Sequence, residues 1–168
     1  GATGMARGML VLILAMWTGS GACASEPVRA SALDYTLRES RDQAIVCKQG
    51  DLERFPGRSL AEVFGQAWPD QPEPSADADR VHAQLTRYHR NEKALKGLPA
   101  QRGLVVTAVL VDASGQPLRA EAICATTDGY DTAATRLAMR ASYKPASIGG
   151  VPLTSVAIVV VPYGGGAN

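Results

Sequence analysis

The strongest constraint on the fold of this 168-residue chain is an apolar run close to its end. Residues 156–161 read VAIVVV, and Pro152 and Pro162 flank this run. β-Branched residues favour strands, and proline cannot donate a hydrogen bond to a neighbouring strand. The run therefore predicts a strand that is entered through Pro152 and ends at Pro162. Residues 164–168 are expected to form a glycine-rich tail.

Two further strands are predicted ahead of this run. Residues 103–112, GLVVTAVLVD, are rich in β-branched side chains, and the turn letters ASGQP connect them to LRAEAICAT at residues 118–126. These two segments predict a β-hairpin. Apolar and polar residues alternate in its second strand, so we expect one interior face, formed by Leu118, Ala120, Ala122 and Cys124.

A helix is expected between the hairpin and the last strand, with Asp128 or Asp131 as its N-cap. Its apolar stripe consists of Tyr130, Ala133, Ala134, Leu137, Ala138 and Ala141. Most of these residues are small. Small side chains allow a helix to pack closely on a sheet. The order strand, strand, helix, strand predicts an α+β fold, in which a small antiparallel sheet carries the helix on one face.

Residues 25–99 read as a mainly helical N-terminal extension that packs on this domain. Ser59 and Glu62 have the spacing of a capping box, and an apolar stripe follows them. This pattern predicts a helix that begins at residue 60. It should end near Trp68, because a proline follows and disfavours helical backbone in the residue before it.

A second helix is predicted further along the extension. Residues 69–79 are rich in proline and acidic side chains and predict a loop. Beyond this loop, Asp79 is expected to cap a helix that ends near Gly97. His82 and His89 would share one face of that helix, where a third ligand would complete a metal site. Two solvated histidines are the plainer interpretation, and we expect no metal and no cofactor.

The N-terminal residues have the pattern of a secretory signal peptide. Arg7 precedes an apolar core, Met9–Trp17, and small residues follow it. This core is too short to span a bilayer comfortably. We therefore expect residues 1–24 to be removed on export, with Met5 as the initiator. The alternative is a lipid-modified Cys23, which is the only route by which we expect the chain to be held at a membrane.

An exported chain meets an oxidising environment, so we expect its two remaining cysteines, Cys47 and Cys124, to form a disulfide. Two separately buried thiols are the alternative. The bridge would close a loop of about 77 residues and stabilise the fold by a few kcal/mol. Cys47 lies in the segment QAIVCK, which fits a short strand or part of a helix.

Several short motifs follow one another in a fixed order between residues 100 and 163. They are Val105 to Asp112 with Gly115, Thr126-Thr127-Asp128-Gly129, Ala133-Ala134, Tyr143-Lys144-Pro145-Ala146, Gly150-Val151-Pro152 and Val156 to Val161. In this order and spacing they resemble the TonB C-terminal domain family. One departure is Asp128, which stands between a hydroxyl pair and a glycine. Residues 25–99 lie outside the resemblance.

The resemblance implies a periplasmic protein that binds a partner through its last strand. Family members pair this strand with an extended segment at the N-terminus of an outer-membrane receptor. Carried over by position, the partner-binding residues are Thr154, Val156, Ile158 and Val160. Energy-transducing members also have an inner-membrane anchor and a long proline-rich spacer. The proline-rich stretch here has only about a dozen residues, so force transmission across a periplasm does not follow from the resemblance.

The sequence contains no motif of a known catalytic site, and we expect no enzymatic activity. A nucleophilic Cys47 with a histidine base is a remote third hypothesis. The net charge of +1 gives no reason to expect a nucleic-acid partner. We therefore expect a peptide- or protein-binding module. The alternative is a structural protein of the cell envelope, whose sheet edge is capped by its own N-terminal half or by the second copy in a homodimer.

Overall fold

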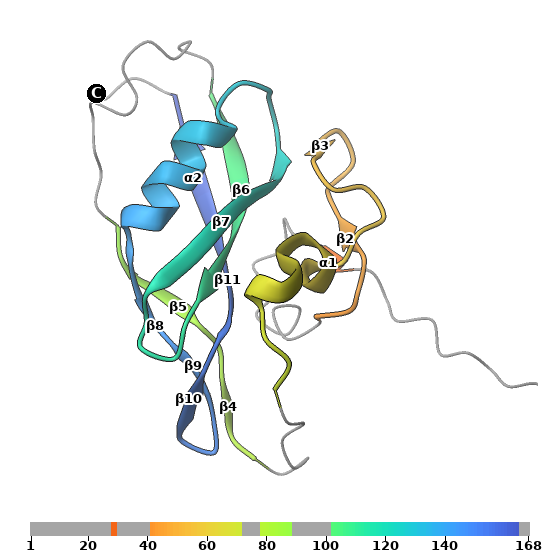
Figure 1. The fold of residues 1–168 in the computed structure, drawn as a ribbon. Coiled ribbons are helices and arrows are strands. Elements are labelled where there is room, and N and C mark those ends of the chain that lie inside the picture. Colours follow the sequence, from red (N-terminus) through yellow and green to blue (C-terminus); the bar gives the residue numbers. More distant parts are fainter. Residues whose placement is uncertain (1–27, 30–40, 72–77, 89–101, 165–168) are drawn as a thin grey trace, which may run out of the picture.

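The computed structural model describes residues 28–29, 41–71, 78–88 and 102–164, and Figure 1 shows how they are arranged. The main sheet has four antiparallel strands in the order β11–β6–β7–β3. These are β3 (Leu52–Glu53), β6 (Gly103–Val111), β7 (Pro117–Ala125) and β11 (Ser155–Tyr163). The predicted hairpin is therefore confirmed as β6 and β7, and β11 lies at one end of the sheet.

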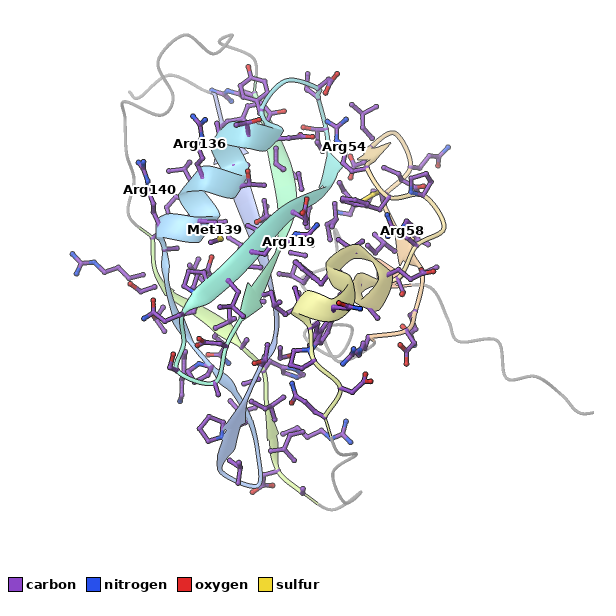
Figure 2. The ribbon with its side chains drawn as sticks, viewed as in Figure 1. Arg54, Arg58, Arg119, Arg136, Met139 and Arg140 are labelled. Atoms are coloured by element: carbon purple, nitrogen blue, oxygen red, sulfur yellow. A yellow bond between two sulfur atoms is a disulfide. The ribbon has the colours of Figure 1, made fainter. Side chains whose placement is uncertain are left out.

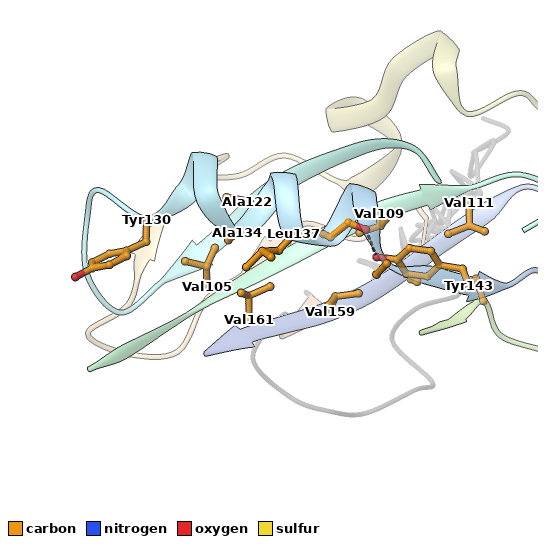
Figure 3. Close-up of a cluster of buried hydrophobic side chains, with 14 of the residues drawn as sticks. Val105, Val109, Val111, Ala122, Tyr130, Ala134, Leu137, Tyr143, Val159 and Val161 are labelled. Atoms are coloured by element: carbon orange, nitrogen blue, oxygen red, sulfur yellow. Dashed lines mark hydrogen bonds between the residues drawn. The ribbon is translucent and has the colours of Figure 1, made fainter. Parts of the chain in front are cut away.

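Helix α2 (Asp131–Arg140) covers one face of this sheet (Figure 1). Its buried residues, Ala134, Leu137 and Ala138, pack on apolar side chains of β6 and β11 in the cluster of Figure 3. The hydroxyl of Tyr143 donates a hydrogen bond to the carbonyl of Ala138 at 2.6 Å, which holds the chain after the helix against its last turn. Burial of this hydroxyl raises the pKa of Tyr143, and the neighbouring Tyr88 raises it further.

The predicted N-cap of α2 is wrong. The N-cap residue is Tyr130, whose ring stacks on Tyr163 with the ring centroids 3.6 Å apart. Asp128 accepts a hydrogen bond from the N–H of Gly129, just ahead of the helix. Both predicted caps, Asp128 and Asp131, instead form ion pairs with Arg54. Aromatic packing and a tertiary ion pair thus replace the local side-chain cap.

Residues 41–71 cover the opposite face of the sheet. This cover segment contains β2 (Ile45–Val46), helix α1 (Leu60–Phe64) and the 3-10 turn η2 (Gly65–Ala67), and β1 (Val28–Arg29) pairs in parallel with β2. Its buried apolar side chains are Ile45, Cys47, Leu60, Val63, Phe64 and Trp68, and they pack in one cluster with Val106, Leu110 and Val156 of the sheet. Because both faces are covered, every residue of β6 from Val105 to Val111 is buried.

The capping box at the start of α1 is confirmed. The side chain of Ser59 accepts a hydrogen bond from the N–H of Glu62, and the carboxylate of Glu62 accepts one from the N–H of Ser59. These bonds to Ser59 lower the pKa of the Glu62 carboxyl group. The α-helix ends at Phe64 because Gly65 has a positive φ of 53°. The 3-10 turn then carries the chain to Trp68, the end that the sequence predicts.

The predicted helix that follows Asp79 is wrong at residues 80–87. These residues form β4 (Arg80–Val81) and β5 (Gln84–Arg87), which pair with the chain that follows α2. Their partners are β9 (Ala146–Ile148) and β8 (Ser142–Lys144), and β9 also pairs with β10 (Val151–Leu153). Backbone pairing with β8 and β9 therefore overrides the local helical preference. The extension is not mainly helical in its described residues, although the α+β class of the chain is confirmed.

The expected single interior face of β7 is found only in part. Ala122, Ile123, Cys124 and Ala125 are all buried, whereas Leu118 is 49% exposed. The register with β6 shifts between Val106 and Thr107, so Ile123 is an extra residue at this point of the strand. The cover segment then buries the face that the sequence assigns to solvent. The alternation pattern fails because a second layer packs on the sheet.

Candidate functional site

The candidate site is the outer edge of β11. This strand pairs with β6 along its whole length, from Ser155 opposite Val111 to Tyr163 opposite Gly103, without a shift in register. In the sheet order, no strand of the described ranges stands on its other side. Strand addition requires a strand in this position, because the peptide pairs with backbone groups that point away from the sheet.

The hydrogen bonds of Leu104 show which residues of β11 direct their backbone groups outward. Both backbone groups of Leu104 bond to Thr126, on the β7 side: its N–H to Oγ1 at 2.9 Å, and its carbonyl to the Thr126 N–H at 3.0 Å. Leu104 lies opposite Pro162, so Pro162 cannot be bonded to β6 at this point. Backbone directions alternate along a strand, so Val156, Ile158 and Val160 also direct their backbone groups away from β6.

This alternation explains why the predicted stop at Pro162 is wrong. Strand β11 continues through Pro162 and ends at Tyr163. The position lacks an N–H, but its backbone faces away from β6, so the ladder loses no hydrogen bond. On the inner side, the carbonyl of Val159 faces β6 and accepts a hydrogen bond from the hydroxyl of Thr107 at 2.8 Å.

The four partner-binding residues predicted from the sequence lie on or next to β11, on the side of the cover segment. Val156 is fully buried against that segment, and Ile158 and Val160 are half-buried at the margin of the same cluster. Thr154 is half-buried and comes directly before the strand. Ile158 also makes an interaction within the chain. The outward backbone groups therefore belong to residues whose side chains lie under the cover segment, as at Val156, or at its rim, as at Ile158 and Val160.

The cover segment holds the start of β11 directly. The carbonyl of Thr154 accepts hydrogen bonds from Nε1 of Trp68 at 3.3 Å and from Nε2 of Gln71 at 2.7 Å. The guanidinium of Arg41 lies over the Trp68 ring, 4.8 Å from its centroid, and donates a hydrogen bond to the Trp68 carbonyl. Sequence reasoning missed these contacts. The only signal was a large aromatic side chain with a polar N–H at the end of a predicted helix.

Cys47 and Cys124 form a disulfide that joins the cover segment to β7. Both cysteines are buried, and Cys124 also lies opposite Glu53 in the pairing of β7 with β3. Arg54 adds an ionic link, with Nε 2.9 Å from a carboxylate oxygen of Asp131. In this state Cys47 has no free thiol, so it does not provide the nucleophile of the third hypothesis.

The predicted pairing of the two histidines on one helix face is wrong. His82 lies between β4 and β5, and His89 lies outside the described residues. No three histidine, cysteine, aspartate or glutamate side chains are grouped to hold a metal ion within the ranges that the structure describes. In that same part of the chain, no helix has the length and apolar character needed to cross a membrane.

Comparison with protein-family models, with curated proteins and with solved structures returned no match for this chain. The resemblance to the TonB C-terminal domain therefore stands on the motifs of residues 100–163 alone. The structural features that bear on function are the outer edge of β11 and the cover segment on the adjacent face of the sheet.

Proposed function

We propose that this chain binds an extended segment of a partner protein by adding it as a strand to the outer edge of β11. One observation carries the proposal: β11 is a nine-residue strand at the end of its sheet. The incoming segment pairs with the outward backbone groups of Val156 and Val160, and it buries more of the half-buried Val160 side chain. At Ile158 it competes with the interaction that the chain makes there itself.

The proposed partner is the N-terminal extended segment of an outer-membrane receptor, and the proposed location is the periplasm. The order β6, β7, α2 and β11 supports the proposal that the domain is TonB-C-like, with the short strands β8, β9 and β10 between α2 and β11. The disulfide supports an oxidising compartment. The role is that of a non-enzymatic binding protein, and no cofactor takes part in it.

The variant Val160→Pro tests the proposal at the backbone. The backbone of Val160, like that of Pro162, faces away from β6, and its N–H points outward. Proline at this position therefore removes a hydrogen bond that a peptide needs and that β6 does not use. We expect stability to change little and peptide affinity to fall about tenfold or more, because a backbone hydrogen bond contributes about 0.5–1.5 kcal/mol and the proline ring also obstructs the peptide. The measurement is an amide-shift titration with a synthetic peptide copied from the extended receptor segment.

The variant Val160→Thr is the matched control, because threonine keeps both the N–H and the β-branched shape. Shifts at residues 155–161 in the original chain and in Val160→Thr, but not in Val160→Pro, support strand addition. Strand addition is wrong if millimolar peptide shifts no amide of β11 in the original chain. It is equally wrong if Val160→Pro binds the peptide as tightly as Val160→Thr does.

A second candidate function is that of a structural envelope protein whose edge is capped by its own N-terminal half. The bonds from Trp68 and Gln71 to the carbonyl of Thr154 favour it, because they hold the cover segment at the start of β11. Under this function the edge binds no peptide even when the cap is weakened. The variant Trp68→Phe removes the Nε1 donor and separates the two functions: peptide binding that appears or strengthens in it supports strand addition in competition with the cap.

A further inference from the structure

Helix α2 carries two exposed arginines on one face. Arg136 and Arg140 are one turn apart, with the exposed Met139 between them, and Figure 2 shows them on the helix that covers the sheet. Like charges at this spacing destabilise a helix. The helix dipole favours Arg140 in the last turn, but it does not favour Arg136 in the middle of the helix. Arginine is itself a good helix former, so what distinguishes the pair is the concentration of positive charge on one exposed face.

Two further cations extend this surface onto the ribbon formed by β5 and β8. Ser142 and Lys144 are exposed on β8, whereas Tyr143 between them is buried. Arg87 of β5 lies opposite Ser142, and residues opposite each other point to the same side of a sheet. Arg87 and Lys144 therefore share the exposed side of the ribbon. That ribbon starts two residues after Arg140, and the bond from Tyr143 to Ala138 holds it against the end of α2.

These residues form what we call the basic face, which consists of Arg87, Arg136, Met139, Arg140 and Lys144. Among the described residues, no carboxylate lies within 4.0 Å of any of its four cationic groups. Arg41, Arg54 and Arg119, by contrast, each form an ion pair. The chain has 17 basic and 16 acidic residues in all, so the basic face is a local excess of positive charge in a nearly balanced protein.

We propose that the basic face is a docking surface for an anionic lipid bilayer. Its four cations complement a negatively charged surface, and their long aliphatic stems suit the boundary between head groups and acyl chains. Met139 gives the face an exposed, flexible apolar side chain that can enter this boundary. The face contains no aromatic ring on which a nucleic-acid base could stack. The basic face consists of residues of α2, β5 and β8 and includes no residue of β11, so the inference does not rest on strand addition.

Vesicle binding tests the proposal. Each basic residue near an anionic bilayer contributes about 1 kcal/mol, so the double variant Arg136→Gln, Arg140→Gln should partition about thirty-fold more weakly onto vesicles. Glutamine is a good helix former, so α2 should remain intact. The measurement is co-sedimentation of the chain with phosphatidylcholine vesicles that do or do not contain phosphatidylglycerol. The matched control is Lys48→Gln, Arg102→Gln, which removes two exposed charges outside the basic face.

Binding that needs phosphatidylglycerol, that salt weakens, and that only the α2 variant loses supports the proposal. Equal binding to both vesicle types overturns it, and so does an equal loss in both double variants, which would reflect total charge. Binding to heparin, a soluble polyanion, is measured as a further comparison. If the chain binds heparin through Arg136 and Arg140 but does not bind anionic vesicles, the basic face recognises a soluble polyanion and the proposal is wrong.

Discussion

Reduction of the Cys47–Cys124 disulfide should weaken the fold more than the loss of any single contact. The bridge joins residues with a sequence separation of 77, and in the chain-entropy account a loop of this length corresponds to about 4.5 kcal/mol of unfolded-state freedom. Measured values for native disulfides fall at about 2–5 kcal/mol, because the reduced unfolded chain retains some structure. We expect the free energy of unfolding to fall by about 2–4 kcal/mol, within this range.

The loss should be uneven across the molecule. The cover segment is bonded to the sheet through β3, which pairs with β7 over only two residues, and through the contacts of Arg54 and Trp68. Strand β6, by contrast, pairs along its length with both β7 and β11. After reduction, amide exchange should therefore accelerate more at Ile45–Val46 and Leu60–Phe64 than at Val105–Val111.

Urea unfolding of the oxidised chain, of the reduced chain and of the variant Cys47→Ala, Cys124→Ala measures this effect. The reduced chain and the double variant should agree in sign, and their m-values should rise because the unfolded chain becomes less compact. A loss below about 1 kcal/mol in the reduced chain would refute the loop-closure reasoning. A uniform rise in exchange across the cover segment and β6 would refute the claim that the cover segment opens first.

Two further predictions concern the packing of the sheet under α2. Gly103→Ala should destabilise the chain by about 1–3 kcal/mol, because a Cβ at this position meets the side chains of Tyr163 and Thr126. The Tyr163 ring, which stacks on Tyr130, would have to move. Thermal unfolding measures the loss of stability and near-ultraviolet circular dichroism the movement of the ring, and an unchanged tyrosine signal would contradict the prediction. Tyr143→Phe should cost only about 1 kcal/mol, because the carbonyl of Ala138 keeps a second donor in the N–H of Ala141. The pKa of Tyr143 is raised from 10.0 in the folded chain, so the unfolded chain loses this proton first and stability falls as pH rises above 10.0. Tyr143→Phe should show a shallower alkaline loss, which urea unfolding across that range checks.

The hairpin, α2 and the last strand were predictable because their patterns are local and redundant. The run from Val105 to Val111 and the capping box at Ser59 each specify one structure from neighbouring residues. The helix prediction for residues 80–87 failed because these residues form strands only by pairing with β8 and β9, far along the chain. The prediction that one face of β7 is exposed to solvent failed because the cover segment buries that face. The sequence placed Val156, Ile158 and Val160 on the last strand, and their role as partner-binding residues stays a prediction. It did not indicate Trp68 and Gln71, since tertiary contacts to a carbonyl leave no pattern in sequence.

The covering of both faces limits how β11 can bind anything. Helix α2 and the cover segment remove the side chains of Val156, Ala157, Val159 and Val161 from solvent, so a partner can reach the strand only through its edge. An edge offers mainly backbone hydrogen bonds, which are tolerant of sequence. Specificity must then come from the half-buried Val160 and from the rim of the cover segment. Proline at the outward position 162 prevents a long second strand from pairing along the whole edge, which is a known protection against aggregation. A short extended segment is therefore the partner that this edge accepts, and a segment long enough to require pairing at Pro162 should bind no more tightly than one that ends before it.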